Sequence, residues 1–226
     1  MAEKAPPRQA DARPAGNGAA LIGWQQRALD RSLVAAKRRA LDKSNGFVQA
    51  AIELLNETGG LTFTVQEVVD RSGLSLCGFY QTFASKDELL LAVFEEYVVL
   101  SAEWQRDLMA KHDDPIQRIR VFVTSLWKGK LRPDVTRALA IYHLTLAATR
   151  PADLARALEP QFTVLLEAVE QGVASGQVRD DIAAPRVAEI LLHIGNAAVQ
   201  TTILQTGTES PDDVWAMCLG GLQAPS

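Results

Sequence analysis

Residues 64–90 read TVQEVVDRSGLSLCGFYQTFASKDELL, and helix start and stop signals follow one another closely along them. Thr64 and Glu67 have the spacing of a capping box, in which each side chain binds the backbone N–H of the other residue. Gly73 can adopt the positive φ that ends a helix, and Ser75 is a suitable N-cap for the next one. Two short helices joined by a glycine-containing turn have the spacing of a helix-turn-helix.

Helical patterns continue on both sides of this stretch. A second capping box, Ser85 to Glu88, starts a long helix, and a stronger helix after Ser44 closes at Gly59-Gly60. Residues 24–42 favour a separate helix. Proline and glycine breaks leave further helices near 115–129, 134–149, 151–175, 184–206 and 211–222. No run alternates apolar and polar residues between turn signals, so the predicted class is all-α.

Composition limits the possible classes of protein. The 226 residues are 47% hydrophobic and 22% charged, which predicts one or two domains with a packed core. Ile190–Thr208 is long enough to cross a membrane, but its histidine, amides and threonines exclude a lipid-facing helix. The N-terminus lacks the apolar segment of a secretory signal. Cys77 and Cys218 are too few for a metal cluster or a disulfide framework, so we expect a reduced, cytoplasmic protein. We also expect no cofactor.

Charge is distributed unevenly along the chain. Residues 1–43 contain nine Lys/Arg and four acids, a net charge of +5, whereas residues 91–226 contain twelve Lys/Arg and seventeen acids, a net charge of −5. A basic head on an acidic body is expected where only one end of a protein meets a polyanion. A solvated basic tail is the alternative.

Residues 47–93 resemble the TetR family of transcriptional regulators. The resemblance lies in the Gly-Gly helix end, the turn Arg71–Ser75, the segment Phe79–Phe83 and the segment Ser85–Leu90. It implies an N-terminal three-helix helix-turn-helix domain followed by a larger helical ligand-binding and dimerisation domain. We expect a disordered leader over 1–23, a basic helical extension over 24–43, the DNA-binding domain over 44–92 and the effector domain over 93–226. Cys77, Gly78 and Phe79 depart from the residues that the family usually has there.

The resemblance assigns candidate DNA contacts. Tyr80 and Lys86 stand where the family contacts phosphate, while Gln66 and Gln81 can hydrogen-bond to base edges. The full set of candidates is Thr64, Gln66, Ser75, Leu76, Cys77, Gly78, Tyr80, Gln81 and Lys86, with Arg38 and Arg39 from the extension. Thr64 and Ser75 can equally be pure helix caps, Gly78 can simply be tolerated, and the basic segment can be a solvated helix face.

Aromatic and polar tips in the apolar C-terminal helices are candidates for an effector pocket. They are Trp104, Phe122, Trp127, Tyr142, His143, Phe162, His193 and Asn196. A cavity lined by them suits a largely apolar ligand with one or two hydrogen-bonding groups. Each of them can instead be an ordinary core residue. The sequence contains no recognisable catalytic or metal-binding motif.

Two C-terminal helices are candidates for a dimer interface. One has the stripe Phe162, Leu165, Leu166, Val169 and Val173, and the other has the small-residue ridge Gly195, Ala198 and Thr202. In the family, two such helices from each subunit form a four-helix bundle that aligns the DNA-binding domains on a palindrome. Together with the resemblance, these features predict a homodimeric repressor that binds double-stranded DNA. A small, largely apolar effector is expected to release it from its operator. The alternatives are a helical small-molecule-binding protein or enzyme without a DNA role, and an architectural DNA-binding protein without an effector.

Overall fold

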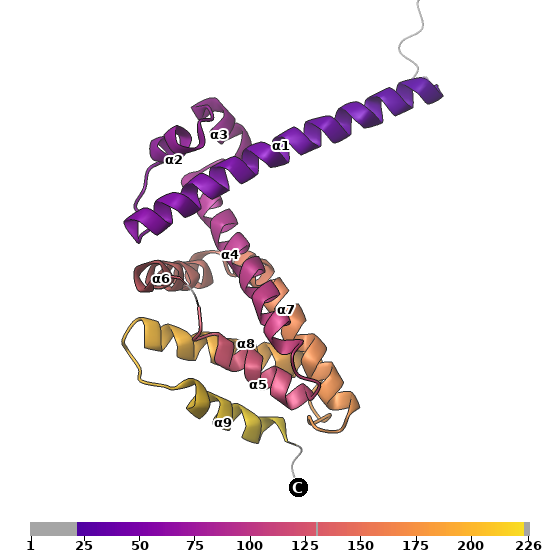
Figure 1. The fold of residues 1–226 in the computed structure, drawn as a ribbon, viewed down its shortest axis with the longest axis vertical. Coiled ribbons are helices and arrows are strands. Elements are labelled where there is room, and N and C mark those ends of the chain that lie inside the picture. The colour runs from indigo at the N-terminus through magenta and orange to yellow at the C-terminus, as the bar shows by residue number, and fades with distance from the viewer. Residues whose placement is uncertain (1–21, 130, 224–226) are drawn as a thin grey trace, which may run out of the picture. The chain divides into compact units, whose positions relative to one another are not determined.

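The computed structural model describes residues 22–129 and 131–223, and all the regular secondary structure in this part is helical (Figure 1). The expectation of a disordered leader concerns residues that, except for 22 and 23, lie outside this part. The nine helices of the described part are α1 Gly23–Thr58, α2 Val65–Ser72, α3 Leu76–Thr82, α4 Lys86–Met109, α5 Pro115–Ser125, α6 Pro133–Thr149, α7 Pro151–Ala174, α8 Ala184–Ile203 and α9 Pro211–Leu222. The all-α prediction is therefore confirmed. No helix in the described part is both long and apolar enough to cross a bilayer.

The chain divides into two units, Met1–Asp42 and Lys43–Ser226, and α1 contributes to both. The sequence predicted two helices here, separated near Ser44. The structure instead has one helix from Gly23 to Thr58. The prediction was wrong because neither Lys43 nor Ser44 breaks a helix, and the flanking residues have good helix propensity.

The second half of α1 packs on the helix-turn-helix. Phe47, Ala51, Leu54 and Leu55 are buried, as their three- and four-residue spacing predicts. The rings of Phe47 and Phe79 meet edge to face with their centroids 5.4 Å apart. Gly59 directly follows the last residue of α1 and has φ 70°, a conformation that favours glycine.

The helix caps that the sequence predicts around α2 and α3 are present. Thr64 and Glu67 form a complete capping box, Gly73 adopts φ 68°, and the Ser75 hydroxyl accepts from the Gly78 N–H at 3.0 Å. The box expected at the start of α4 is only half formed. Its hydroxyl accepts from the Glu88 N–H, but the Glu88 carboxylate accepts from the Ala84 N–H instead.

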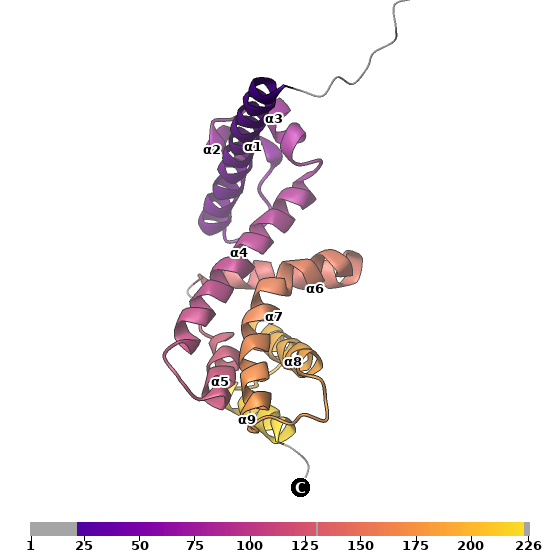
Figure 2. The same ribbon diagram turned by 90° about the vertical axis from the view of Figure 1, so that its right-hand side faces the viewer.

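The C-terminal body is assembled on the long helices α4 and α7, which lie side by side (Figures 1 and 2). Helices α5 and α8 pack against α7, and α9 packs against α5 and α8. Ile119, Phe122, Leu165 and Val169 are completely buried in this body. Proline occupies the first turn of each helix from α5 to α9, where it costs no hydrogen bond.

The two stripes predicted for dimerisation lie largely inside the single chain. Leu165 and Val169 belong to its core, and a Cβ on Gly195 would come 2.6 Å from Leu126 Cδ1. Gly195 therefore allows close approach of α8 to the segment after α5. The periodicity correctly identified apolar faces, but it could not distinguish a face buried within the chain from one available to a second chain.

Candidate nucleic-acid interface and ligand cavity

Helix α3 presents a compact solvent-exposed face. Leu76, Cys77, Tyr80 and Gln81 are exposed on it, and the Gln81 Nε2 donates to the Cys77 Sγ at 3.6 Å. The caps on either side of the turn fix the direction of the helix, while Phe79 anchors it in the core. The exposed face combines a phenol, an amide and an apolar side chain, which are suited to phosphate, base edges and thymine methyl groups respectively.

Gly78 points inward instead of belonging to this exposed face. It is buried, and a Cβ there would meet the Ser75 Oγ at 3.2 Å and the Phe47 Cζ at 3.9 Å. Its expected place among the DNA contacts is therefore corrected. The reason is geometric, because position 78 lies next to Phe79 on the inner side of the helix.

Three further polar candidates, besides Gln81, have partners within the chain. The Thr64 hydroxyl donates to Glu67 at 2.8 Å, and the backbone and hydroxyl of Thr64 lower the pKa of the Glu67 carboxyl. The Gln66 Nε2 donates to Asp70 at 2.7 Å, and the Ser75 hydroxyl caps α3. Thr64, Gln66 and Ser75 remain exposed, so these hydrogen bonds orient them without covering them.

Lys86 is tied to the preceding loop. Its Nζ donates to the Leu61 carbonyl at 2.7 Å and lies 4.9 Å from the centroid of the Phe63 ring. Burial lowers the pKa of the ammonium. The sequence predicted a phosphate contact for this residue, whereas its contacts in the structure join the α4 N-terminus to the loop before α2.

The helix-turn-helix itself is acidic. Residues 44–90 contain two basic residues, Arg71 and Lys86, and six acidic ones, a net charge of −4. Arg71 is also engaged, because its guanidinium donates to both carboxylate oxygens of Glu57 at 2.7 Å and to Glu53 at 3.4 Å. This ion pair lowers the pKa of the Glu57 carboxyl and joins α2 to α1. Both basic groups of the domain therefore have intramolecular partners.

The N-terminal unit carries the opposite charge. Its helical part exposes the candidates Arg38 and Arg39, together with Arg27, Arg31 and Lys37. Arg27, Arg31 and Arg38 are four and seven residues apart, a spacing that places them on one face of the helix. Their exposed guanidinium groups form a basic row, which we call the arginine row.

The C-terminal body contains two cavities that share part of their walls. The larger, of about 350 Å³, lies among α4, the segment between α5 and α6, α6, α7 and α8; the second, of about 340 Å³, lies among α4, α5, that same segment and α7. Tyr97, Leu126 and Gln161 line both. These volumes fall within the lower part of the range expected of small-molecule sites.

The structure brings half of the predicted pocket residues to these cavities. Trp127, His143 and Asn196 line the larger one and Trp104 lines the second. The other four line neither cavity. Phe122 is fully buried in the core, Phe162 packs partly buried against it, Tyr142 is buried, and His193 is exposed on α8.

Two of the predicted residues have other contacts instead. The Tyr142 hydroxyl donates to the Asp87 carbonyl at 3.2 Å, so this side chain joins α6 to the start of α4. Burial raises the pKa of Tyr142 to about 12. Burial, together with the nearby His193, lowers the pKa of His143.

A buried row of polar side chains beside the cavities was not anticipated from the sequence. The Gln161 Nε2 donates to the Gln105 Oε1 at 3.2 Å, and the Gln105 Nε2 donates to the Ser125 Oγ at 3.2 Å. Gln105 and Gln161 come from α4 and α7, far apart in the chain. The only signal was a glutamine on the apolar side of each helix, which is weak evidence for burial.

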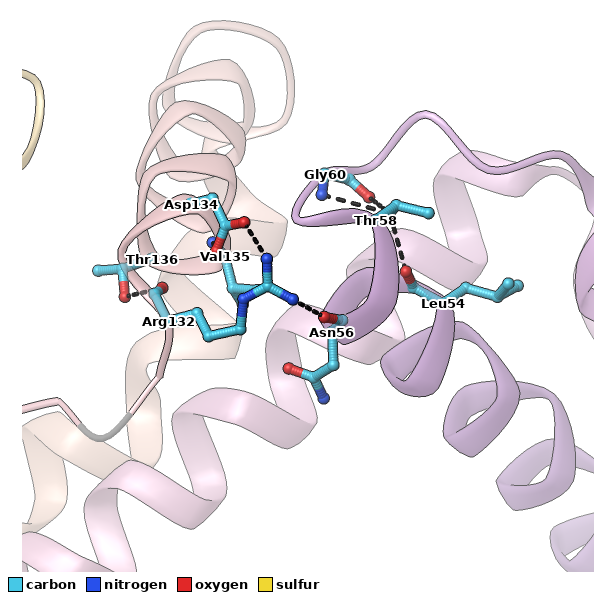
Figure 3. Close-up of polar contacts among 8 residues, drawn as sticks. All are labelled: Leu54, Asn56, Thr58, Gly60, Arg132, Asp134, Val135 and Thr136. Atoms are coloured by element: carbon cyan, nitrogen blue, oxygen red, sulfur yellow. Dashed lines mark hydrogen bonds and ion pairs between the residues drawn. The ribbon is translucent and has the colours of Figure 1, made fainter.

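Arg132, at the start of α6, contacts the end of α1 (Figure 3). Its guanidinium donates to the Asn56 carbonyl and, at 2.5 Å, to Asp134. Asp134 also lies against Gly59, where any Cβ would clash with its carboxylate. The neighbouring residues Leu131 and Pro133 line the larger cavity, so the cavity wall and the contact with α1 belong to one short segment.

Comparisons with known proteins agree with this architecture. Residues 47–93 match the family model described as bacterial regulatory proteins, tetR family, which confirms the resemblance seen in the sequence. The chain therefore contains the helix-turn-helix of TetR-family transcriptional regulators and has their fold. A comparison with curated proteins gives no match.

Solved structures share the fold over most of the chain. The regulator FadR from Bacillus subtilis in complex with stearoyl-CoA has a TM-score of 0.60 and 16% identity, covering 79% of this chain and 98% of its own. FadR from Thermus thermophilus in complex with lauroyl-CoA has a TM-score of 0.63 and 18% identity, covering 81% and 96%. RolR in complex with resorcinol has a TM-score of 0.63 and 19% identity, covering 82% and 90%.

Proposed function

We propose that this protein, whose chain has the fold of TetR-family transcriptional regulators, is a cytoplasmic homodimeric repressor that binds a palindromic DNA operator and is released by a small effector. The observation that carries the proposal is the exposed face of α3, held by the Gly73 turn and the Ser75 cap in the arrangement of a recognition helix. Leu76 and Gln81 are its proposed reading residues, with Cys77 beside Leu76, and Tyr80 is a proposed phosphate contact.

We further propose that cations outside the helix-turn-helix provide much of the affinity. Both basic residues of the acidic domain 44–90 are already engaged, while the arginine row and Arg39 are exposed. Counterion release by such cations supplies most sequence-independent affinity for DNA. In this proposal α3 reads the sequence, and the N-terminal extension binds the phosphate backbone.

Homodimerisation is proposed to use the outer side of α7 and α8. Ile190, His193, Ile194 and Ala197 are exposed on α8 with helical spacing, and the half-buried Phe162 lies on α7. Such an apolar stripe favours association with a second copy, because a two-fold interface buries the same patch on both subunits.

Effector release is proposed to act through the segment that contains Arg132. A ligand in the larger cavity would contact Leu131 and Pro133, and their displacement would alter the bond from Arg132 to the Asn56 carbonyl. The solved relatives that contain acyl-CoA or resorcinol support a ligand role for a cavity in this fold. A coupling free energy of about 1–3 kcal/mol suffices, and it must act in both directions.

The first test is the binding of the full chain to the DNA beside its own gene, measured by fluorescence anisotropy at two salt concentrations. A scrambled duplex of equal length is the competitor. Gln81→Ala should reduce the preference for the specific duplex about tenfold, in line with about 1–3 kcal/mol for a base contact. Gln177→Ala, the same kind of change at an exposed position outside the interface, should leave it unaltered.

Weak and equal affinity for both duplexes, unaffected by Gln81→Ala, would refute the regulator proposal and favour the alternative of a small-molecule-binding protein without a DNA role. Binding distributed evenly over long DNA would instead favour an architectural protein. Dimerisation is measured separately by sedimentation.

A further inference from the structure

The chemistry of the cavity walls restricts what the two cavities can bind. No residue lining either cavity in the described part of the chain carries a formal charge. An ionised group placed there would lose its hydration without gaining a counter-charge, which is costly in a protein interior. The walls therefore favour an uncharged ligand. Lys130, between the lining residues Gly129 and Leu131, lies outside the described part and is tested below.

Asn196 provides an unused hydrogen-bond donor. Its Nδ2 is buried, has no acceptor among the described residues, and belongs to a side chain that lines the larger cavity. A buried donor without a partner destabilises a protein unless something else accepts from it. An oxygen atom on a bound molecule would satisfy this amide.

Gln161 provides a complementary acceptor where the two cavities share a wall. Because its Nε2 donates to Gln105, the orientation of the amide is fixed and its carbonyl oxygen remains for another partner. Gln105 is held in turn by Ser125. A ligand hydroxyl that reaches this wall could donate to the Gln161 oxygen.

We propose that the cavities bind an uncharged, largely apolar molecule that carries an oxygen acceptor for Asn196 and a hydroxyl donor for Gln161. Hydroxylated aromatic ketones are of this chemical class. The inference rests on the proposed function only in calling this molecule the effector, because the binding chemistry follows from the walls alone.

The charge requirement is tested with a matched pair of dyes. N-phenyl-1-naphthylamine and 8-anilinonaphthalene-1-sulfonate have the same ring skeleton, and only the second carries a sulfonate. Titration of the full chain, followed by energy transfer from tryptophan, should show at least tenfold tighter binding of the neutral dye. Equal or tighter binding of the sulfonate, or no binding of either dye, would overturn the proposal. So would sulfonate binding that is lost in Lys130→Met, because a cation would then serve the site.

The acceptor requirement is tested with benzophenone, an uncharged ketone, which should displace the neutral dye. Asn196→Leu should weaken this displacement about tenfold, the effect of losing one buried hydrogen bond. The same variant should bind the neutral dye as well as or better than the wild type does, because that dye has no oxygen to accept from Asn196. Asn45→Leu, the same replacement at an exposed position of α1, is the matched control and should change neither value.

If Asn196→Leu weakens the binding of benzophenone and of the neutral dye equally, with the fold intact by circular dichroism, the role of Asn196 as a hydrogen-bond donor to the ligand is overturned. These titrations contain no DNA, so their result does not depend on operator binding. Release of DNA by lauroyl-CoA and not by benzophenone would overturn the uncharged class and leave the repressor proposal standing. Benzophenone binding by a chain without sequence-dependent DNA affinity would support the uncharged ligand class and overturn the repressor proposal.

Discussion

The arginine row makes a quantitative prediction about salt. Arg27, Arg31 and Arg38 are exposed on one face of α1 and span about 16 Å at 1.5 Å per residue. One DNA strand presents about five phosphates over that length, at about 3.4 Å per phosphate, so three simultaneous contacts are sterically reasonable. Replacing all three residues by glutamine keeps the helix propensity and removes three positive charges from each subunit.

Each phosphate contact contributes about 0.9 to the slope of log affinity against log salt, so a dimer without its six row arginines should show a slope lower by about 5. Between 50 and 200 mM salt the wild type should then lose about a thousandfold more affinity than the variant. The assay is anisotropy with a labelled duplex at several salt concentrations. The preference for the specific over the scrambled duplex should change little, because phosphate contacts carry no sequence information.

The matched control replaces three exposed cations of the C-terminal body, Lys111, Lys128 and Arg156, by glutamine. It makes the same change in net charge and should leave the slope unaltered. A slope that the row variant and this control lower equally would show an effect of total charge only. An unchanged slope in the row variant would remove the extension from the DNA interface.

Three further predictions concern the body. Arg132→Gln should lower the free energy of unfolding by only about 0.5–1 kcal/mol, because the bond to the Asn56 carbonyl is exposed. It should nevertheless reduce the effect of effector on DNA affinity, which is measured as effector binding in the presence and absence of DNA. Undiminished coupling in the variant would refute the proposed route. Ile194→Asp should convert the dimer to monomers in sedimentation and weaken operator binding, and an unaffected dimer would place the interface elsewhere. Because burial lowers the pKa of His143, the folded chain binds a proton at this residue less readily than the unfolded chain does. The free energy of unfolding should therefore fall as pH decreases from 7.5 to 5.5, by at most about 1.4 kcal/mol per pH unit. Urea unfolding of His143→Gln should show a weaker dependence of stability on pH, and an identical dependence would exclude this residue as the cause.

Local signals allowed the helix-turn-helix to be predicted from the sequence in detail. The Thr64–Glu67 box, the left-handed Gly73 and the Ser75 cap depend on residues within three positions of one another, so spacing alone determines them. The limits of α9 were predicted for the same reason, since proline and glycine act locally.

Contacts between distant segments could not be predicted in this way. Lys86 looked like a free cation because nothing local indicates that the Leu61 carbonyl lies within its reach. Similar sequences surround the aromatic residues Phe122, Phe162 and Trp127, yet of these three only Trp127 lines a cavity. Which side of a helix faces a void depends on the packing of all its neighbours, and hydrophobic periodicity does not contain that information.

The polarity of the cavity has an evolutionary consequence. The amides of Gln161 and Asn196 are among its hydrogen-bonding groups. In the genetic code every glutamine codon is one base from a glutamate codon, and every asparagine codon is one base from an aspartate codon. Gln161 lines both cavities, so a single such mutation would place a carboxylate at their common wall with almost no change in side-chain volume, and it would remove the hydrogen bond that the Gln161 Nε2 donates to Gln105. If the proposed function holds, one mutation would shift the ligand preference of the cavities towards cations, while the helices, the caps and the exposed face of α3 stay as they are.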